Sequence, residues 1–497
     1  RQVVEAVGMV RRWRLWVLVL AVWVSACGPA ALPPASTTEA QGAVQETLAP
    51  LPTETPERPM YSPGELVDYV AQAGDTLEAI AVHFNTSVAE IRAANSFIPA
   101  ETTTMPPGMP LKIPIYYAPF WGPTYQILPD SLFVNGPAQA GFDIEAFVSS
   151  QPGWLSQYRG YAAGDTRSGA NTVQLVAQNF SLSPRLLLAL LEFQSGALSQ
   201  ASPPGGSTDY VLGNPDPFYR GVYLQLVWAA NLLNDAYYRW RLGELVTFEH
   251  LDGRVERPDP WQNAGSVALQ VYFSQLVSGA AYLQAVRANG LAQTSARLFG
   301  DPWQNLTPHI PGSLQQPALR LPFEEGKAWS YTGGPHTAWG EGAPLAALDF
   351  APGMDTGGCT PSDEWVTAVA AGVVTRSEPA TVTLDLDMDG DERTGWVIFY
   401  FHLATEGRVP AGTVLQAGER IGHPSCEGGR ATGTHVHVAR LYNGEWMAAA
   451  GTLAFNLDGW IAQNGARPYL GTLKRNTQVV TASDKSDQYS RIEAGTH

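Results

Sequence analysis

Apolar residues follow two different spacings in the middle and in the last third of the chain. Long apolar stretches at 172–179, 184–192 and 222–233 are bounded by Ser, Pro and Gly, and 264–288 continues in the same style. These stretches predict helices. Further along, the run 396–402 alternates so that Ile398, Tyr400 and His402 share one face of a strand. The pattern predicts a mainly helical region at 125–315 and a β-rich region after it.

The first 60 residues differ from the rest of the chain. Arg11, Arg12 and Arg14 precede an almost wholly apolar stretch at 15–24, and the segment ending at Cys27 resembles a bacterial lipoprotein signal. This resemblance implies a signal at 1–27, lipid attached to Cys27, and an exported protein tethered to a membrane surface. An uncleaved helical anchor is the alternative. Residues 28–60, rich in Pro, Ala, Thr and Glu, predict a disordered linker.

Histidines and one aspartate form the strongest chemical pattern. His435 and His437 are one residue apart in a β-like run, so both side chains should project from the same face. His336, Asp349 and His402 precede them. Two neutral imidazoles and a carboxylate leave a fourth zinc position open for water, as in catalytic zinc sites. The pattern favours metal-assisted hydrolysis, although any one of these histidines alone is more typical of a hydrogen-bonded strand residue.

Residues 325–450 resemble the lysostaphin-type zinc endopeptidases, which cut peptide bridges in bacterial cell walls. The resemblance is carried by Tyr400-Phe401-His402-Leu403, by glycine-punctuated strands, and by His435-Val436-His437. It implies a mostly antiparallel β domain at 316–470, with His336, Asp349 and His437 as zinc ligands and His402 and His435 as catalytic histidines. One departure is that His336 lies 13 residues before Asp349 (349 − 336), where the family usually has four.

The expected catalytic roles of His402 and His435 follow from the lack of a glutamate base in a metal-binding motif. The chain has no His-Glu-x-x-His helix that would supply a glutamate base. Proton transfer and oxyanion stabilisation would then fall to His402 and His435, whose side chains titrate in the right range. Which of the two is the base is left open, and His402 could instead merely cap a strand.

Residues 61–115 resemble a LysM module, with a Gly-Asp-Thr-Leu turn at 74–77 and a closing Pro-Gly and Leu-x-Ile-Pro. The resemblance implies a strand-helix-helix-strand fold that binds glycans containing N-acetylglucosamine, such as peptidoglycan. We expect glycan contacts from Gly74, Asp75 and Thr76 and from the segment near Ile98. Generic packing is the alternative role for each of them.

The helical region contains a faint likeness to the catalytic helix of lytic transglycosylases, in which a glutamate precedes Ser-Gly. Gln194 stands at that position, and a neutral amide cannot donate a proton as a carboxylic acid does. Glu192 is displaced by two residues. We therefore interpret 125–315 as a non-catalytic, lysozyme-like helical domain.

Two further patterns concern calcium and cysteine. Asp385, Asp387 and Asp389 alternate before a glycine, like the first half of a calcium loop, but Trp396 stands where an EF-hand needs glutamate. A calcium-binding hairpin tip and a solvated acidic turn both remain open. With Cys27 assigned to lipid, Cys359 and Cys426 form an even pair that predicts one disulfide in an oxidising compartment.

Composition limits the partners. The 46 acidic and 30 basic residues give a formal charge of −16, which argues against nucleic acid. The fold class expected is multidomain α+β, ending in a polar, frayed tail at 471–497. The function expected is a Zn²⁺-dependent endopeptidase of peptidoglycan. The alternative is a non-catalytic wall-binding activator of a separate amidase, which would not need every candidate ligand.

Overall fold

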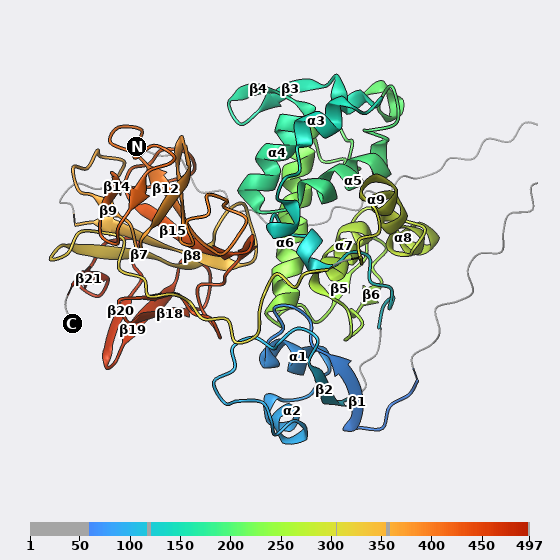
Figure 1. Cartoon of the computed structure of the whole chain (residues 1–497), viewed down its shortest axis with the longest axis horizontal. Helices are drawn as coiled ribbons and strands as arrows, with labels where there is room; N and C mark the ends of the chain where they lie inside the picture. Colours follow the sequence, from blue (N-terminus) through green and yellow to red (C-terminus); the bar gives the residue numbers. More distant parts are fainter. Residues whose placement is uncertain (1–58, 117–120, 305, 354–357, 496–497) are drawn as a thin grey trace, which may run out of the picture. The chain divides into compact units, whose positions relative to one another are not determined.

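The computed structural model describes residues 59–116, 121–304, 306–353 and 358–495 of the 497-residue chain. The lipoprotein-like signal 1–27 with Cys27 and nearly all of the linker 28–60 lie outside these residues. Among the described helices, none combines the length and apolar character that crossing a membrane requires. The described chain is an α+β protein, so the predicted fold class is confirmed (Figure 1).

The first folded region has the predicted strand-helix-helix-strand order. It contains β1 (Glu65–Val70), α1 (Leu77–His83), α2 (Val88–Ala94) and β2 (Pro110–Ile115). The two strands pair antiparallel, with Val67 opposite Ile113. Both helices start at polar caps, because Thr76 accepts from the Ala79 N–H and Ser87 forms a reciprocal capping box with Glu90.

The middle region is mainly helical, as the apolar stretches predict. Its helices are α3 (Ile144–Ser149), α4 (Gly169–Phe180), α5 (Pro184–Ser195), α6 (Val222–Arg241), α7 (Ala264–Ser274), α8 (Gly279–Val286) and α9 (Leu291–Phe299). The region also contains the single helical turns η1 (Asp130–Leu132), η2 (Pro137–Gln139), η3 (Trp154–Ser156), η4 (Pro204–Gly206) and η5 (Pro217–Tyr219). Its short strands are β3 (Arg159–Ala162), β4 (Asp165–Ser168), β5 (Phe248–Glu249) and β6 (Val255–Glu256). The stretch 264–288 forms two helices, because the backbone between them leaves helical geometry, with Ser278 extended at φ −128° and ψ 170°.

The last region is built on a nine-stranded sheet (Figure 1). Its strands are β7 (Ala328–Thr337), β8 (Leu345–Pro352), β10 (Gly372–Glu378), β11 (Ala380–Asp385), β12 (Trp396–Leu403), β13 (Val414–Leu415), β15 (Val436–Tyr442), β16 (Glu445–Trp446) and β21 (Arg491–Glu493). The order is β13-β10-β11-β12-β15-β8-β7-β21, with β16 paired to β15, and the pairings within it are antiparallel. The two strands β9 (Val366–Thr367) and β14 (Arg420–Gly422) pair separately.

The chain end departs from the sequence-based expectation. A four-stranded sheet is formed by β17 (Asn456–Leu457), β18 (Trp460–Asn464), β19 (Gly471–Arg475) and β20 (Gln478–Thr481). The prediction of a frayed tail is therefore wrong for residues 471–495. Leu473, Val480 and Ile492 are buried in the same apolar core as the large sheet, and their strands are paired, so burial and strand pairing together order this polar segment.

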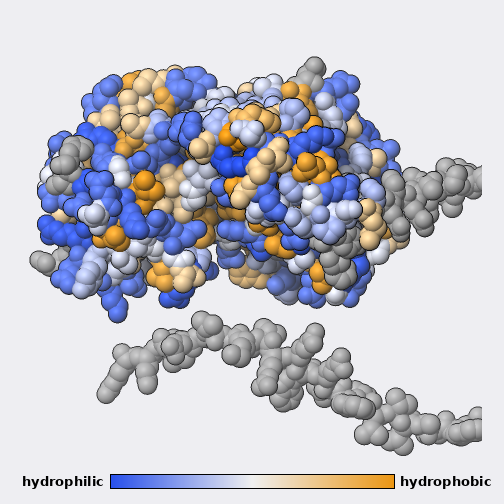
Figure 2. Space-filling model, turned by 90° about the horizontal axis from the view of Figure 1, so that it is seen from below, coloured by the Kyte–Doolittle hydropathy of each residue, from blue (hydrophilic) through white to orange (hydrophobic). Residues whose placement is uncertain are grey.

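One face of the surface is mostly covered by hydrophilic residues (Figure 2). The face drawn in Figure 2 is largely hydrophilic, with apolar residues in small separate groups rather than one broad patch. Scattered apolar side chains of this kind are normal for a protein surface.

Candidate metal centre

The register of the large sheet brings three of the predicted site residues together. His437 of β15 lies opposite Asp349 of β8, so the two side chains share a face of the sheet. Asp349 in turn lies opposite Gly333 of β7, and irregular pairing between Gly333 and His336 directs His336 to the same place. Three strands thus supply one residue each.

The donor atoms of these residues form a nearly equilateral triangle. His336 Nε2 lies 3.0 Å from His437 Nδ1, and Asp349 Oδ1 lies 3.2 Å from each nitrogen. Two ligands held at about 2.0–2.1 Å by a tetrahedral zinc are about 3.3 Å apart. All three side chains are buried. The spacing and the donor set therefore suit a tetrahedral cation with one open position.

The outer nitrogens of both imidazoles fix where their lone pairs point. His336 Nδ1 donates to the Gly334 carbonyl at 2.8 Å, and His437 Nε2 donates to the Ala338 carbonyl at 3.0 Å, since a carbonyl can only accept. In the neutral rings the facing nitrogens then both carry lone pairs. Two lone pairs at 3.0 Å need a proton or a cation between them, so the site fits a metal ion.

Asp349 completes this arrangement. Its Oδ1 is buried and has no hydrogen-bond partner within the described chain, although two imidazole nitrogens are close. Burial alone would raise the pKa of Asp349, but the adjacent His336 and His435 outweigh it and hold that pKa well below its usual range. Asp349 likewise raises the pKa of His336 against the effect of burial. Without a metal ion, a proton on the His336 ring therefore occupies the position between His336 and Asp349 where a cation would bind.

His402 reaches this face through an irregular backbone. Phe401 lies opposite His437, so strict alternation would place the next residue, His402, on the other face with Ile398 and Tyr400, as the sequence predicts. Instead His402 has a φ of +62°, next to a register shift between β11 and β12. Its ring therefore lies beside His435, with the ring centres 4.5 Å apart. This left-handed conformation costs energy and is retained where it aims a side chain.

His402 and His435 each donate one ring N–H to a backbone carbonyl, as His336 and His437 do. His402 Nδ1 donates to the Glu427 carbonyl and His435 Nδ1 to the Gly433 carbonyl, at 2.8 and 2.7 Å. Their Nε2 atoms then carry the lone pairs, and His435 Nε2 lies 3.9 Å from Asp349 Oδ2. Burial, aided by the neighbouring His435, lowers the pKa of His402 to about 4. His402 is therefore neutral at pH 7, with a lone pair on Nε2 that can accept a hydrogen bond.

Residues 425–427 form three hydrogen bonds with His402. The His402 carbonyl accepts from the Ser425 N–H and hydroxyl at 2.7 and 2.9 Å, and the Glu427 carbonyl holds its ring. Between them, Cys426 is joined to Cys359, so the predicted disulfide is present. Hydrogen bonds and a covalent bond together support the strained backbone.

Tyr469 is a site residue that the sequence analysis missed. Its ring stacks on His336, with centres 4.1 Å apart and planes 20° apart, although the side chain is 57% exposed. Two backbone hydrogen bonds tie Tyr469 to Gly334 and Pro335. Tyr469 has a φ of +69°, and nothing in the sequence around it predicts this left-handed conformation.

The long separation of His336 and Asp349 is explained by a hairpin. β7 and β8 are consecutive antiparallel strands joined by a connection at 338–344, and His336 lies opposite Ala347. The extra residues lengthen the connection without moving the ligands apart.

The other predicted binding residues have internal roles that leave their predicted functions untested. In the LysM-like region Asp75 accepts from the Tyr69 hydroxyl and the Gln72 N–H, both at 2.7 Å, and burial raises its pKa to about 6. Gly74 has a φ of +83°, and Ile98 is buried in the core. Glycan binding by these residues remains a prediction.

Two other sequence patterns fall on hydrogen-bonded side chains. Gln194 accepts from the Tyr272 hydroxyl and donates to the Leu212 carbonyl, while Glu192 is buried and pairs with Arg297 at 3.0 Å. Asp385, Asp387 and Asp389 have carboxylate oxygens within 4.8 Å of one another at the β11–β12 tip. Calcium binding there remains a prediction.

Comparisons with known proteins identify the enzyme class. The beta-lytic metalloendopeptidase of Lysobacter enzymogenes is 31% identical over 141 residues, which cover 27% of this chain and 74% of that protein. The chain belongs to the beta-lytic metalloendopeptidase family. It is accordingly a metalloendopeptidase, so the predicted enzyme class is confirmed.

A second curated relative matches a longer part of the chain. Protease LasA of Pseudomonas aeruginosa strain UCBPP-PA14 is 25% identical over 342 residues, covering 65% of this chain and 75% of that protein. The LasA N-terminal domain family matches residues 126–312, and the LysM domain family matches residues 69–114. The LysM interpretation is confirmed, whereas the lysozyme-like interpretation of 125–315 remains a prediction. The solved M23 metalloprotease pseudoalterin is 26% identical, with a TM-score of 0.29 over 34% of this chain and 96% of its own.

Proposed function

We propose that this metalloendopeptidase is zinc-dependent and hydrolyses peptide bonds in bacterial peptidoglycan. The observation that carries the proposal is the convergence of His336 Nε2, His437 Nδ1 and Asp349 Oδ1 within 3.2 Å of one another, with both imidazole lone pairs directed inward. Nitrogen and carboxylate donors in this ratio are those of catalytic zinc sites. His336, Asp349 and His437 would hold the ion.

The chain's own residues supply proton transfer. Zinc, when bound, polarises the scissile carbonyl and lowers the pKa of a coordinated water. His402 is neutral, buried and aimed by two backbone anchors, so it can take a proton from the nucleophile and return it to the leaving amine. His435 Nδ1 is held by the Gly433 carbonyl, so its Nε2 would first take up a proton from solvent and could then donate a hydrogen bond to the charge that develops on the carbonyl oxygen.

Peptidoglycan is proposed as the substrate because the chain combines a module of a glycan-binding kind with a peptidase. A LysM-family module suits the glycan strand, and an endopeptidase suits the cross-linking peptide. Export with a lipid on Cys27 would place both parts outside the cytoplasm, where a disulfide persists. Mass spectrometry of the amino-terminal peptide from a bacterial host tests the lipid, since an unmodified, uncleaved peptide contradicts it.

The decisive experiment joins metal analysis to product analysis. The purified chain should contain one zinc per molecule and clear a suspension of peptidoglycan, releasing muropeptides with new amino termini. A chelator should stop the clearing, and added zinc should restore it. New reducing ends without new amino termini would contradict peptide hydrolysis.

The same experiment separates the proposed enzyme from an activator of a separate amidase. An activator would bind the wall without releasing fragments by itself, with or without zinc. His435→Ala provides the matched control, because it should bind peptidoglycan normally and release fragments far more slowly than the wild type.

A further inference from the structure

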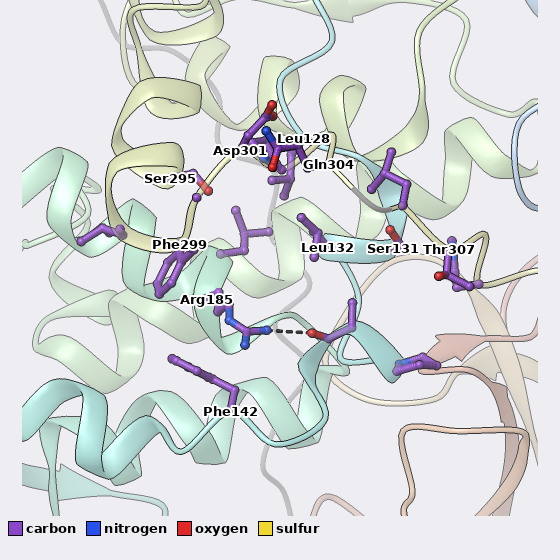
Figure 3. Close-up of a pocket in the computed structure, with 18 of the residues that line it drawn as sticks. Leu128, Ser131, Leu132, Phe142, Arg185, Ser295, Phe299, Asp301, Gln304 and Thr307 are labelled. Atoms are coloured by element: carbon purple, nitrogen blue, oxygen red, sulfur yellow. Dashed lines mark hydrogen bonds between the residues drawn. The ribbon is translucent and has the colours of Figure 1, made fainter.

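A cavity of about 670 Å³ is lined mainly by residues of the helical region, together with Asn443 (Figure 3). It lies among the first turn of α5, the last turn of α9, the turns η1 and η2, and residues of the segments 300–304 and 306–309. Its volume is within the roughly 300–1,000 Å³ of small-molecule sites. None of the residues proposed above for zinc binding or catalysis lines it.

One side of the cavity is aromatic. Phe142, Phe147 and Phe299 contact one another with ring centres 5.2 to 5.8 Å apart, and none of the three is fully buried. Leu132 and Leu298 extend the apolar lining and are likewise only partly buried. Apolar side chains left accessible in a concave site favour a ligand with a hydrocarbon body.

Arg185 provides a cation beside this apolar wall. Its guanidinium lies 4.3 Å from the centre of the Phe142 ring, and Nη1 donates to the Ala138 carbonyl at 2.7 Å and the Gln139 side-chain oxygen at 3.0 Å. Both acceptors are neutral. None of the ion pairs found within the described ranges includes Arg185.

The surroundings leave the charge of Arg185 uncompensated. Burial lowers the pKa of Arg185, and the nearby Arg393 lowers it further. Asp391 offers no compensation, because both of its oxygens are held by Arg393 at 2.6 and 2.8 Å. Asp301 also lines the cavity, but Figure 3 places it at the opposite end from Arg185, and it accepts from the Trp303 N–H.

We propose that this cavity binds a monocarboxylate with an apolar tail, of the fatty-acid type. The carboxylate would pair with the planar guanidinium of Arg185, which matches its geometry. The hydrocarbon chain would lie against Phe142, Phe147 and Phe299. The inference concerns a site apart from the peptidase centre and does not depend on which bond the enzyme cuts.

A ligand series tests both halves of the proposal on the full chain. An environment-sensitive dansyl-undecanoate probe should bind with a rise in fluorescence, and decanoate should displace it. Acetate should not displace it, because it has no tail, and decylamine should not, because its charge is wrong. Decanol should compete at least about tenfold more weakly than decanoate, as expected for loss of a charge-assisted hydrogen bond.

Two variants locate the site. Arg185→Met keeps the length of the side chain and removes its charge, so it should weaken decanoate at least about tenfold and leave decanol unchanged. Arg167→Met is the matched control, since Arg167 is also partly buried and donates to the Ala162 carbonyl but does not line the cavity. It should change neither affinity.

The proposal is overturned by any of three results. These are equal decanoate affinity in wild type and Arg185→Met, displacement of the probe by decylamine as strongly as by decanoate, or displacement by an apolar tripeptide carboxylate but not by decanoate. The last result would assign the cavity to a peptide end instead. Phe299→Ala gives a separate check, because it should weaken decanoate and decanol alike.

Discussion

Two clusters in the last third of the chain offer three metal-ligand side chains each, and they differ in what holds the remaining polar atoms. At the metal centre, backbone carbonyls bind the outer nitrogens of His336 and His437, leaving two lone pairs and Asp349 Oδ1 facing one another. At the β11–β12 tip, turn N–H groups and a hydroxyl bind the carboxylate oxygens of Asp385, Asp387 and Asp389.

The contrast shows that proximity of ligand types is a weak criterion. Both clusters place three donor atoms within 4.8 Å. The imidazole cluster is buried and is left with unpaired acceptors, which costs free energy unless a cation or proton satisfies them. The acidic cluster is largely exposed, and its own turn already satisfies it. We expect strong metal binding in the first and weak binding in the second.

Removing a ligand should have the largest effect and also separates ligand from catalyst. His437→Ala should lose both zinc and turnover. His435→Ala should keep about one zinc per chain, while kcat falls about 10²- to 10⁴-fold. Elemental analysis and muropeptide release measure the two properties. Equal loss of zinc in both variants would contradict the division of roles.

Crowding Asp349 should weaken the centre without removing any ligand. A Cβ at Gly333 would lie 2.4 Å from Asp349 Oδ2, so Gly333→Ala must displace the carboxylate. We expect about 10- to 100-fold weaker zinc binding in competition with a chromophoric chelator, as for other changes around metal ligands.

Gly353→Ala is the control for this crowding, because among the described residues its Cβ would meet the Ala328 carbonyl oxygen alone, at an ordinary contact distance of 3.5 Å. It should leave zinc affinity unchanged. Unaltered affinity in Gly333→Ala would show that Asp349 does not need its observed position.

Opening the disulfide should affect the catalytic histidine more than the metal. Cys359→Ser with Cys426→Ser should leave zinc content unchanged while kcat falls about tenfold, since His402 is aimed by the adjacent residues Ser425 and Glu427. The free energy of unfolding should fall by about 2–4 kcal/mol, measured by denaturant titration. Zinc loss matching the activity loss would show that the bridge supports the ligands instead.

The acidic tip should give the smallest effects. Burial raises the pKa of Asp385 from 3.8 to about 6, so in that interval the folded protein holds a proton that the unfolded chain has released. Without calcium, stability should therefore decline slightly as pH rises from 3.8 to about 6, and Asp385→Asn should remove that slope.

Calcium itself is tested at neutral pH in thermal melts. Millimolar calcium should raise Tm by at most about 2 °C. A larger rise that Asp389→Asn abolishes would establish a calcium site and contradict the expected weak binding.

Sequence reasoning located the ligand strands because their signals are local. A His-x-His pair fixes two side chains on one face wherever a strand forms, and the helical stretches and the LysM-like turn are equally local. The alternation rule misplaced His402, however, because a single left-handed residue reverses the face and histidine gives no local sign of it. Tyr469 and the ordered segment 471–495 were missed because their contacts depend on strands far away in the sequence.

The placement of Tyr469 has a consequence for how such enzymes diversify. The large sheet carries the three proposed ligands, whereas Tyr469 stands in the connection between β18 and β19 of the separate four-stranded sheet. An insertion or exchange in that connection can reshape the approach to the reacting bond while coordination stays intact. Selectivity and chemistry are thereby free to evolve at different rates within one fold.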